Sequence, residues 1–425
     1  MAQISIPYGE KEITFKIAGH HFQEILYPNR VTFPEDQITE VKQALEKPIG
    51  SGRLSEIVRP GQKIALLCDD ISRPTPTAKL LPLIVEELNL CGVADEQITV
   101  IMALGSHRPM SEAEIELKVG AALRERLAVF NSEFRDQTKQ VNLGVAPGGT
   151  QVWADRRAME ADIRIGIGSI VPHPAVGWSG GGKIIYPGIT GEATVAAFHL
   201  QHGKTPWNMF GSENSPVREN MERWIKQVGL HFIVNVVCTP DGKIYKAVAG
   251  DYIKAHRVGV GFAKELYGVK ANCKVDVAVV SSHPADADFW QATKGVLSGE
   301  FILKDGGTLI LVTPCPEGVG PHPSYTTYIG CTGIENKLDE IAVSPEGIRD
   351  PLAAPVGATI SRIKKRVKLA LVSDGIDLFE ANRAGFAKYA TIEAAIDEIL
   401  PQYGPSAKVT VLPYGAETYP IVAGT

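Results

Sequence analysis

Three short segments of this 425-residue chain bring ionisable side chains together with glycine or proline. Imidazole can both accept and donate a proton near neutral pH, and a guanidinium fork matches a carboxylate. The three segments therefore indicate a functional site. Their ionisable residues are Asp70 and Arg73 in DISRP, His107 in GSHRP, and His173 followed by Lys183 in HPAVGWSGGGK.

The third segment continues as GWSGGGKIIYPGITG (177–191), which matches the first seven positions of a phosphate-binding P-loop. The eighth position of a P-loop is a Ser or Thr that binds Mg²⁺, and here it is Ile184. A P-loop also opens a helix, which Pro187 and the glycines around it would resist. A phosphotransferase is therefore disfavoured, and Lys183 needs another role.

Each of the three segments follows an apolar run that is typical of a buried strand, at 63–70, 98–105 and 161–170. The first run is followed by a helical pattern at 77–92, and strands that alternate with helices indicate a parallel α/β sheet. Ligands of open α/β sheets bind beyond the carboxyl ends of the strands. We therefore expect the ionisable residues to form one site.

A second set of apolar strands begins near residue 275, and the polar segment 281–295 follows the first of them. Gln291 and Lys294 are three residues apart and would share one helix face, which suits binding of a carboxylate or phosphate. His199 lies on a predicted helix that runs away from the glycine loop.

The fold class predicted is α/β, with two domains of mainly parallel sheets flanked by helices and an active site in the cleft between them. We expect an N-terminal domain over 1–268 and a C-terminal domain over 269–407. Residues 408–425 are expected to form a strand whose sheet the pattern does not decide, and 381–400 to form a helical segment.

The composition is that of an ordinary globular protein, with 44% hydrophobic and 21% charged residues. A formal charge of −5 argues against nucleic-acid binding. No apolar run approaches the roughly 20 residues of a membrane span, and the start MAQISIPYGE lacks signal-peptide features. We therefore expect a cytoplasmic protein without membrane or nucleic-acid partners.

The six cysteines are scattered without a C-x-x-C pair, which argues against a structural zinc site and a disulfide framework. A metal site at His283, Asp286 and Asp288 is disfavoured, because aspartates near a helix start usually cap it.

Taken in order, the motifs D-x-x-R-P, G-S-H-R-P, H-P, G-G-G-K, His199 and Q-x-x-K resemble the lactate racemase family. The resemblance spans most of the chain and implies a nickel-pincer nucleotide, a pyridinium mononucleotide with two sulfur-containing arms and a nickel–carbon bond. It implies that Lys183 forms a thioamide tether to this cofactor and that His199 ligates the nickel. Enzymes that make the cofactor would then be partners.

The remaining motif residues receive roles from the same resemblance. His107 and His173 match the two acid/base histidines. Asp70, Arg73, Gln291 and Lys294 match residues around cofactor and substrate, and Arg73 and Lys294 could hold the substrate carboxylate. The implied reaction removes hydride from a 2-hydroxy acid while a base takes the hydroxyl proton. The planar 2-keto acid then takes the hydride back on its other face. Two bases serve the two hydroxyl orientations.

Two departures leave the substrate open. Trp290 precedes Gln291 where the lactate-converting member of the family has a tyrosine, and His283 adds an ionisable ring. A larger 2-hydroxy acid, or a sugar acid epimerised at C2, is as compatible as lactate. A non-catalytic protein that closes two domains on a hydroxy acid is the alternative function. A zinc hydrolase is disfavoured because the histidines lack i, i+4 spacing.

Overall fold

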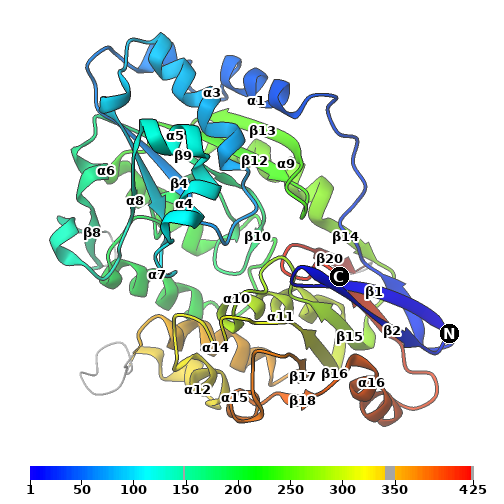
Figure 1. Cartoon of the computed structure of the whole chain (residues 1–425). Helices are drawn as coiled ribbons and strands as arrows, with labels where there is room; N and C mark the ends of the chain where they lie inside the picture. The colour runs from blue at the N-terminus through cyan, green and yellow to red at the C-terminus, as the bar shows by residue number, and fades with distance from the viewer. Residues whose placement is uncertain (147–148, 340–349, 423–425) are drawn as a thin grey trace. The chain divides into compact units, whose positions relative to one another are not determined.

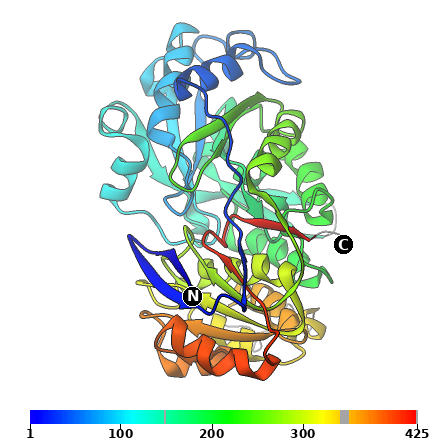
Figure 2. The same cartoon turned by 90° about the vertical axis from the view of Figure 1, so that its right-hand side faces the viewer.

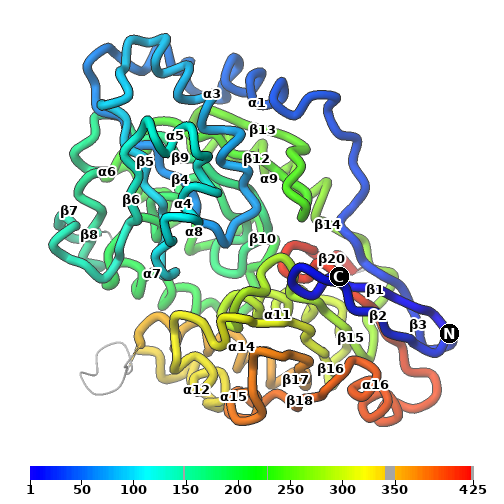
Figure 3. The backbone as a smooth tube through the Cα atoms, in the orientation of Figure 1, coloured from blue at the N-terminus to red at the C-terminus, as the bar shows by residue number. Residues whose placement is uncertain are grey.

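The computed structural model describes residues 1–146, 149–339 and 350–422. Contacts divide them into two compact units. Unit 1 contains Met1–Asn29, His199–Gly211 and Leu266–Thr425, and unit 2 contains Arg30–Phe198 and Ser212–Glu265. The chain thus starts in unit 1, builds most of unit 2 and then returns (Figure 3). Within the described ranges, no helix is long and apolar enough to cross a membrane.

Unit 2 is built on a six-stranded sheet of order β13-β12-β9-β4-β5-β6 (Figure 1). All neighbours are parallel except β12 and β13. The expected strands at 63–70, 98–105 and 161–170 are confirmed as β4, β5 and β9. The strands of the sheet are β4 (Ile64–Asp69), β5 (Ile98–Ala103), β6 (Ala128–Asn131), β9 (Ile163–Ser169), β12 (Phe232–Cys238) and β13 (Ile244–Gly250).

The helices of unit 2 follow from amphipathic patterns and caps. Ile84 of α3 and Ile115 of α4 share one core with Leu66 of the sheet. A capping box starts α4: the Ser111 hydroxyl accepts from the Glu114 N–H, and the Glu114 carboxylate accepts from the Ser111 N–H. The helices are α1 (Gln37–Glu46), α2 (Leu54–Ile57), α3 (Thr77–Leu90), α4 (Glu112–Val119), α5 (Ala121–Arg126), α6 (Arg156–Glu160) and α8 (Pro216–Val228). Two hairpins, β7 (Gln140–Val145) with β8 (Gln151–Asp155) and β10 (Pro172–His173) with β11 (Gly177–Trp178), complete the unit.

Unit 1 contains a second six-stranded sheet, of order β18-β17-β16-β15-β19-β3, in which all neighbours are parallel. Side chains alternate along β15, so that Val277 packs into one core and Ala278 into the other. The strands are β3 (Phe22–Ile25), β15 (Val275–Ser281), β16 (Leu303–Val312), β17 (Lys368–Val372), β18 (Ala387–Tyr389) and β19 (Val409–Leu412).

The two faces of the unit 1 sheet are covered differently. The hairpin of β1 (Ala2–Tyr8) and β2 (Lys11–Ile17) covers one face together with α16 (Ile392–Ile399), as Figure 2 shows. The other face packs against four helices, α11 (Lys294–Gly299), α12 (Tyr325–Gly330), α14 (Ala353–Ile363) and α15 (Leu378–Ala384).

Two expectations for the C-terminal region were wrong in detail. The segment 381–400 is not one helical stretch, because α15 ends at Gly385, whose φ of +75° favours glycine, and β18 follows before α16 begins. The tail contains two strands instead of one. β19 enters the large sheet between β15 and β3, whereas β20 (Tyr419–Val422) pairs with β14 (Gly268–Ala271).

The units also differ from the expected ranges 1–268 and 269–407. Met1–Asn29 groups with unit 1 because β3 pairs with β19 of that sheet. Two of the four unit boundaries fall inside helices, in α7 (Glu192–Lys204) and in α9 (Lys254–Tyr267). Hydrophobic patterning along the sequence does not reveal such a pairing between distant segments.

Candidate active site

The unit 2 sheet changes the direction of its connections at β4. From β4 the chain goes through α3 to β5 on one side, whereas β9 lies on the other side of β4. A ligand site is expected at such a switch point, beyond the carboxyl ends of the strands. The loops that leave β4, β5 and β9 there carry Asp70, His107 and His173, as the sequence predicted.

Asp70 and His107 form a hydrogen-bonded pair at this edge. His107 Nδ1 lies 2.5 Å from Asp70 Oδ2, and Asp70 Oδ1 accepts from the N–H and the hydroxyl of Ser72. Burial alone would raise the pKa of Asp70. The attraction and hydrogen bond of His107, together with Arg73 and Ser72, outweigh burial and hold this pKa well below its usual range. Asp70 is therefore an anion that fixes the His107 ring, whose side chain stays 18% exposed.

Lys118 of α4 binds the backbone of the loop that carries Asp70 and Arg73. Lys118 is buried, and its Nζ donates to the carbonyl oxygens of Arg73 and Thr75. The same ammonium lies 3.1 Å from Asp69 Oδ1. Sequence reasoning missed Lys118 because a lysine on an amphipathic helix is usually exposed.

Lys183 lies in the short 3₁₀ turn Gly181–Ile184, not at the start of an α-helix. It is half-buried. Burial lowers its pKa to about 7, and the charges of Arg73 and Arg218 act in the same direction while Asp70 opposes them. Electrostatic contact with Arg73 and Asp70 means that the structure brings Lys183 to the same loop cluster.

The glycines before Lys183 serve the packing of the loop itself. Gly177 has φ +74°, and a Cβ there would lie 1.9 Å from the Ser212 carbonyl oxygen. A Cβ on Gly182 would lie 2.1 Å from Ile225. Contacts within the protein are thus enough to require glycine.

His173 ends β10 in the hairpin with β11. Its Nδ1 accepts a hydrogen bond from the Ala175 N–H at 3.2 Å. A neutral His173 therefore carries its proton on Nε2, whereas a neutral His107 carries it on Nδ1, toward Asp70.

The other predicted residues lie in unit 1. His199 is on α7, and its ring meets the Trp290 indole edge-on at 6.0 Å between centroids. Trp290 and Gln291 belong to the single turn α10 (Phe289–Ala292), and Lys294 starts α11. Lys294 Nζ donates to Gln291 Oε1 at 2.6 Å, which confirms that the two side chains share one face.

Comparison with known proteins identifies the family of this chain. Residues 8–209 match the lactate racemase N-terminal domain, and residues 269–419 match the lactate racemase C-terminal domain. The lactate racemase of Lactiplantibacillus plantarum is 30% identical over 423 residues, which cover 98% of this chain and 99% of that protein. The chain belongs to the lactate racemase family.

A second lactate racemase, from Thermoanaerobacterium thermosaccharolyticum, is 33% identical over 76% of this chain and 77% of its own length. The solved structure of lactate racemase apoprotein from that organism covers 99% of this chain and 100% of its own, with a TM-score of 0.86 and 29% identity. A protein from Thermotoga maritima shares the fold, with a TM-score of 0.70 and 19% identity over 91% of this chain and 98% of its own. Membership in this family makes the chain an isomerase of the racemase type.

The acidic residues and His283 in the segment after β15 make hydrogen bonds within the protein. Asp288 caps α10 by accepting from the Gln291 N–H, and Asp286 accepts from the Gly9 N–H and pairs with His283 at 2.9 Å. Among the residues the structure describes, no cluster of three or more His, Cys, Asp or Glu could hold a metal ion.

Two buried groups of polar residues escaped the sequence reasoning. In unit 2, Arg218 of α8 contacts the backbone of the glycine loop. In unit 1, His322 Nδ1 pairs with Asp350 Oδ2 at 2.7 Å, and the His322 ring lies 4.3 Å from Trp290. His322 and Asp350 are 28 residues apart, and neither belongs to a recognisable motif.

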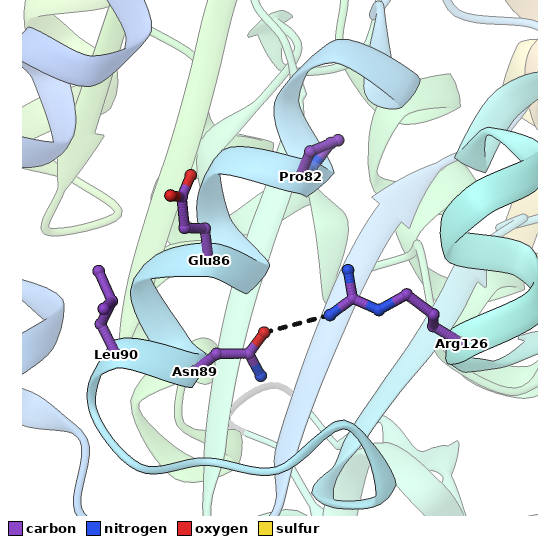
Figure 4. Close-up of a pocket in the computed structure, with 5 residues that line it drawn as sticks. All are labelled: Pro82, Glu86, Asn89, Leu90 and Arg126. Carbon is purple, nitrogen blue, oxygen red and sulfur yellow. Dashed lines mark hydrogen bonds between the residues drawn. The ribbon is translucent and has the colours of Figure 1, made fainter.

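An open surface pocket in unit 2 has no part in this site. It is lined by Pro82, Glu86, Asn89, Leu90 and Arg126 (Figure 4). α3 starts at the carboxyl end of β4, so its last turns lie at the opposite edge of the sheet from His107. The Arg126 guanidinium is bound by Asn89 and Asp95.

Proposed function

We propose that this chain interconverts the two configurations at C2 of a 2-hydroxy acid, through a 2-keto acid, with the nickel-pincer nucleotide as its cofactor. The observation that supports this most is the loop cluster of unit 2. There a carboxylate-backed histidine and a lysine with a pKa of about 7 share one electrostatic environment. Proton transfer needs the histidine, and covalent attachment of a cofactor needs the lysine.

The residues present fit the cofactor. A tether needs a neutral, nucleophilic amine, and burial gives Lys183 that form at neutral pH. Lys183 lies in a single 3₁₀ turn and is half-buried as a residue. We assign the nickel ligand to His199, since neutral imidazole suits nickel. When bound, the cofactor supplies a reversible hydride acceptor.

His107 and His173 accept or donate the proton of the substrate hydroxyl. The neutral His107 ring has its lone pair on Nε2, where it accepts a proton, and Asp70 stabilises the imidazolium that forms. His173 presents an N–H at Nε2 and donates it to the substrate oxygen in a hydrogen bond. To act as a base at Nε2, His173 must move its proton to Nδ1 and give up the hydrogen bond from Ala175.

Cationic side chains hold the substrate carboxylate. We assign this role to Arg73, whose backbone is fixed by Lys118, and to Lys294, whose ammonium Gln291 orients. Asp70 and Gln291 complete the set around cofactor and substrate.

The proposed substrate class is broader than lactate. The relatives are named for lactate, but the indole of Trp290 packs between His322 and His199 and offers no phenolic hydroxyl. A longer 2-hydroxy acid or a sugar acid belongs to the same class, because the reaction involves only C2 and its hydroxyl.

The first test measures cofactor attachment. The chain is coexpressed with enzymes that make the nickel-pincer nucleotide, and its intact mass and nickel content are determined. We expect a mass gain and about one nickel per chain. Lys183→Ala should abolish the mass gain, whereas Lys226→Ala, at an exposed lysine of α8, should retain it. Wild type without either signal would refute the cofactor assignment.

The second test identifies the reaction. Enantiopure 2-hydroxy acids and C2-epimeric sugar acids are incubated with the loaded protein and analysed by chiral chromatography. Interconversion of at least one pair is expected. Binding without interconversion, unchanged in the His107→Ala/His173→Ala double variant, would favour the non-catalytic binding protein.

A further inference from the structure

The loop that leads to Lys183 rests on a buried ionic cluster in unit 2. Arg218, on α8, is 3% exposed. Its Nε donates to the Val176 carbonyl oxygen at 3.1 Å, and its terminal nitrogen donates to the carbonyl oxygen of Trp178 and, at 3.5 Å, to that of Gly180. One guanidinium therefore holds three of the five carbonyls in 176–180.

A second side chain, His256, binds the Ser179 carbonyl, which lies between those of Trp178 and Gly180. His256 Nε2 lies 2.8 Å from the Ser179 carbonyl oxygen, and its Nδ1 accepts from Arg257. Burial, with Arg218 and Arg257 nearby, lowers the pKa of His256 well below its ordinary value, so the ring is neutral and donates from Nε2. The loop backbone is thus fixed from α8 and α9 together.

The cluster carries a surplus positive charge. Glu222 pairs with Arg218 at 3.2 Å and with Arg257 through both carboxylate oxygens, at 2.9 and 2.7 Å. Two guanidinium groups share one carboxylate, while His256 is neutral. Arg218 and Glu222 are buried, whereas the Arg257 side chain is 41% exposed. Removing Glu222 therefore leaves the buried charge of Arg218 without its carboxylate partner.

Burial is the largest cause that lowers the pKa of Lys183, and nearby charges modify it. The charged groups that act on this pKa are Arg73 and Asp70 from the loop after β4, Asp69 from β4, and Arg218 from α8. The two carboxylates favour the ammonium form, whereas both guanidinium groups favour the neutral amine. Arg218 differs from the other three because it also holds the backbone of the loop that ends at Lys183.

We infer that Arg218 is the positioning residue for Lys183: it anchors the loop that presents this lysine, and its positive charge adds to the burial that favours the neutral amine. The inference deepens the proposed function and rests on it for the meaning of Lys183 as a tether. In unit 2, Arg164 also donates to backbone carbonyls, those of Ala158, Ala161 and Gly229, without acting electrostatically on Lys183. It is a matched control.

The test measures the reactivity of Lys183 in protein without cofactor. Acetic anhydride is applied across pH 5.5 to 10, and acetylation of the Lys183 peptide is quantified by mass spectrometry. The wild-type profile should be half-maximal near pH 7, since only the neutral amine reacts. Arg218→Gln should shift the midpoint upward, and Arg218→Lys, which keeps the charge, by less. Arg164→Gln should lower the thermal midpoint without moving the profile.

A second variant covers the case in which Arg218→Gln does not fold. Glu222→Gln removes the neutralising carboxylate and should shift the Lys183 midpoint downward. An unchanged profile in folded Arg218→Gln, or in Glu222→Gln, would overturn the inference. This failure is distinct from failure of the proposed function, in which wild type gains neither cofactor mass nor nickel although its acetylation profile is as expected.

Discussion

His107–Asp70 in unit 2 and His322–Asp350 in unit 1 have almost the same geometry. In each, the histidine Nδ1 meets an aspartate Oδ2, at 2.5 and 2.7 Å. The surroundings differ. The His107 side chain is 18% exposed at the end of β5, whereas the His322 side chain is 0% exposed beside Trp290. Among the described residues, the buried Nε2 of His322 has no hydrogen-bond partner.

The aspartates also have different second partners. Asp70 Oδ1 is bound by Ser72 in a loop at the site. Asp350 Oδ1 accepts from the N–H groups of Leu352 and Ala353, at the start of α14. The same pair of residues thus holds a partly exposed ring in one unit, the base in our proposal, and stabilises a helix start and an aromatic contact in the other. Access to solvent, and not the pair itself, separates the two roles.

The largest difference is expected in catalysis. Asp70→Asn should lower the racemisation rate by about 10²- to 10⁴-fold, because the imidazolium of His107 loses its counter-charge. Asp350→Asn should leave the rate per folded, loaded enzyme within about threefold of wild type. Chiral chromatography of both variants measures this. A loss below tenfold in Asp70→Asn would contradict the assignment of His107 as a base.

For stability, the Asp350 variant is expected to lose more than the Asp70 variant. Asp350→Asn should lower the free energy of unfolding by about 3–5 kcal/mol, since it breaks a fully buried pair and a helix cap. Asp70→Asn should lower the free energy of unfolding by less than half as much, because the His107–Asp70 pair is partly exposed to solvent. Urea unfolding followed by circular dichroism compares the two variants. Equal losses would show that exposure does not distinguish the pairs.

The stability difference should depend on pH. Burial raises the pKa of Asp350, but the hydrogen bond and charge of His322 and the N–H groups of Ala353 and Leu352 outweigh burial and lower it. A carboxyl with a lowered folded pKa stabilises above its unfolded pKa, about 3.9, and loses this contribution as pH falls toward the folded pKa. The gap between wild type and Asp350→Asn should therefore narrow below about pH 4. Unfolding curves at pH 7 and pH 3.5 test this, and a constant gap would contradict it.

The smallest effect concerns Ser72. Ser72→Ala removes a hydroxyl donor to Asp70, which should cost about 1.5 kcal/mol, or roughly tenfold in turnover. The control is Ser111→Ala, which removes the cap of α4. It should lower stability by about 1 kcal/mol and leave turnover unchanged. If both variants turn over equally, Ser72 does not act through Asp70.

The sequence determined the parallel strands of unit 2 and the edge at which Asp70, His107 and His173 lie. Apolar runs that end in polar residues predict buried strands. Because the carboxyl ends of parallel strands lie at the same edge of a sheet, the polar residues after them are expected at one edge. It also determined the pairing of Gln291 with Lys294, because residues three apart on a helical segment are neighbours.

Only the tertiary structure decided which groups support those residues. Lys118, Arg218 and His322 are buried through contacts with segments distant in the chain, and no local pattern distinguishes them from exposed cations or ordinary histidines. The glycines before Lys183 show the same limit. The sequence marked them as special, but the packing of Ser212 and Ile225 against the loop supplies the reason. Local chemistry fixes which side chains can react, and long-range packing fixes their charge state and orientation.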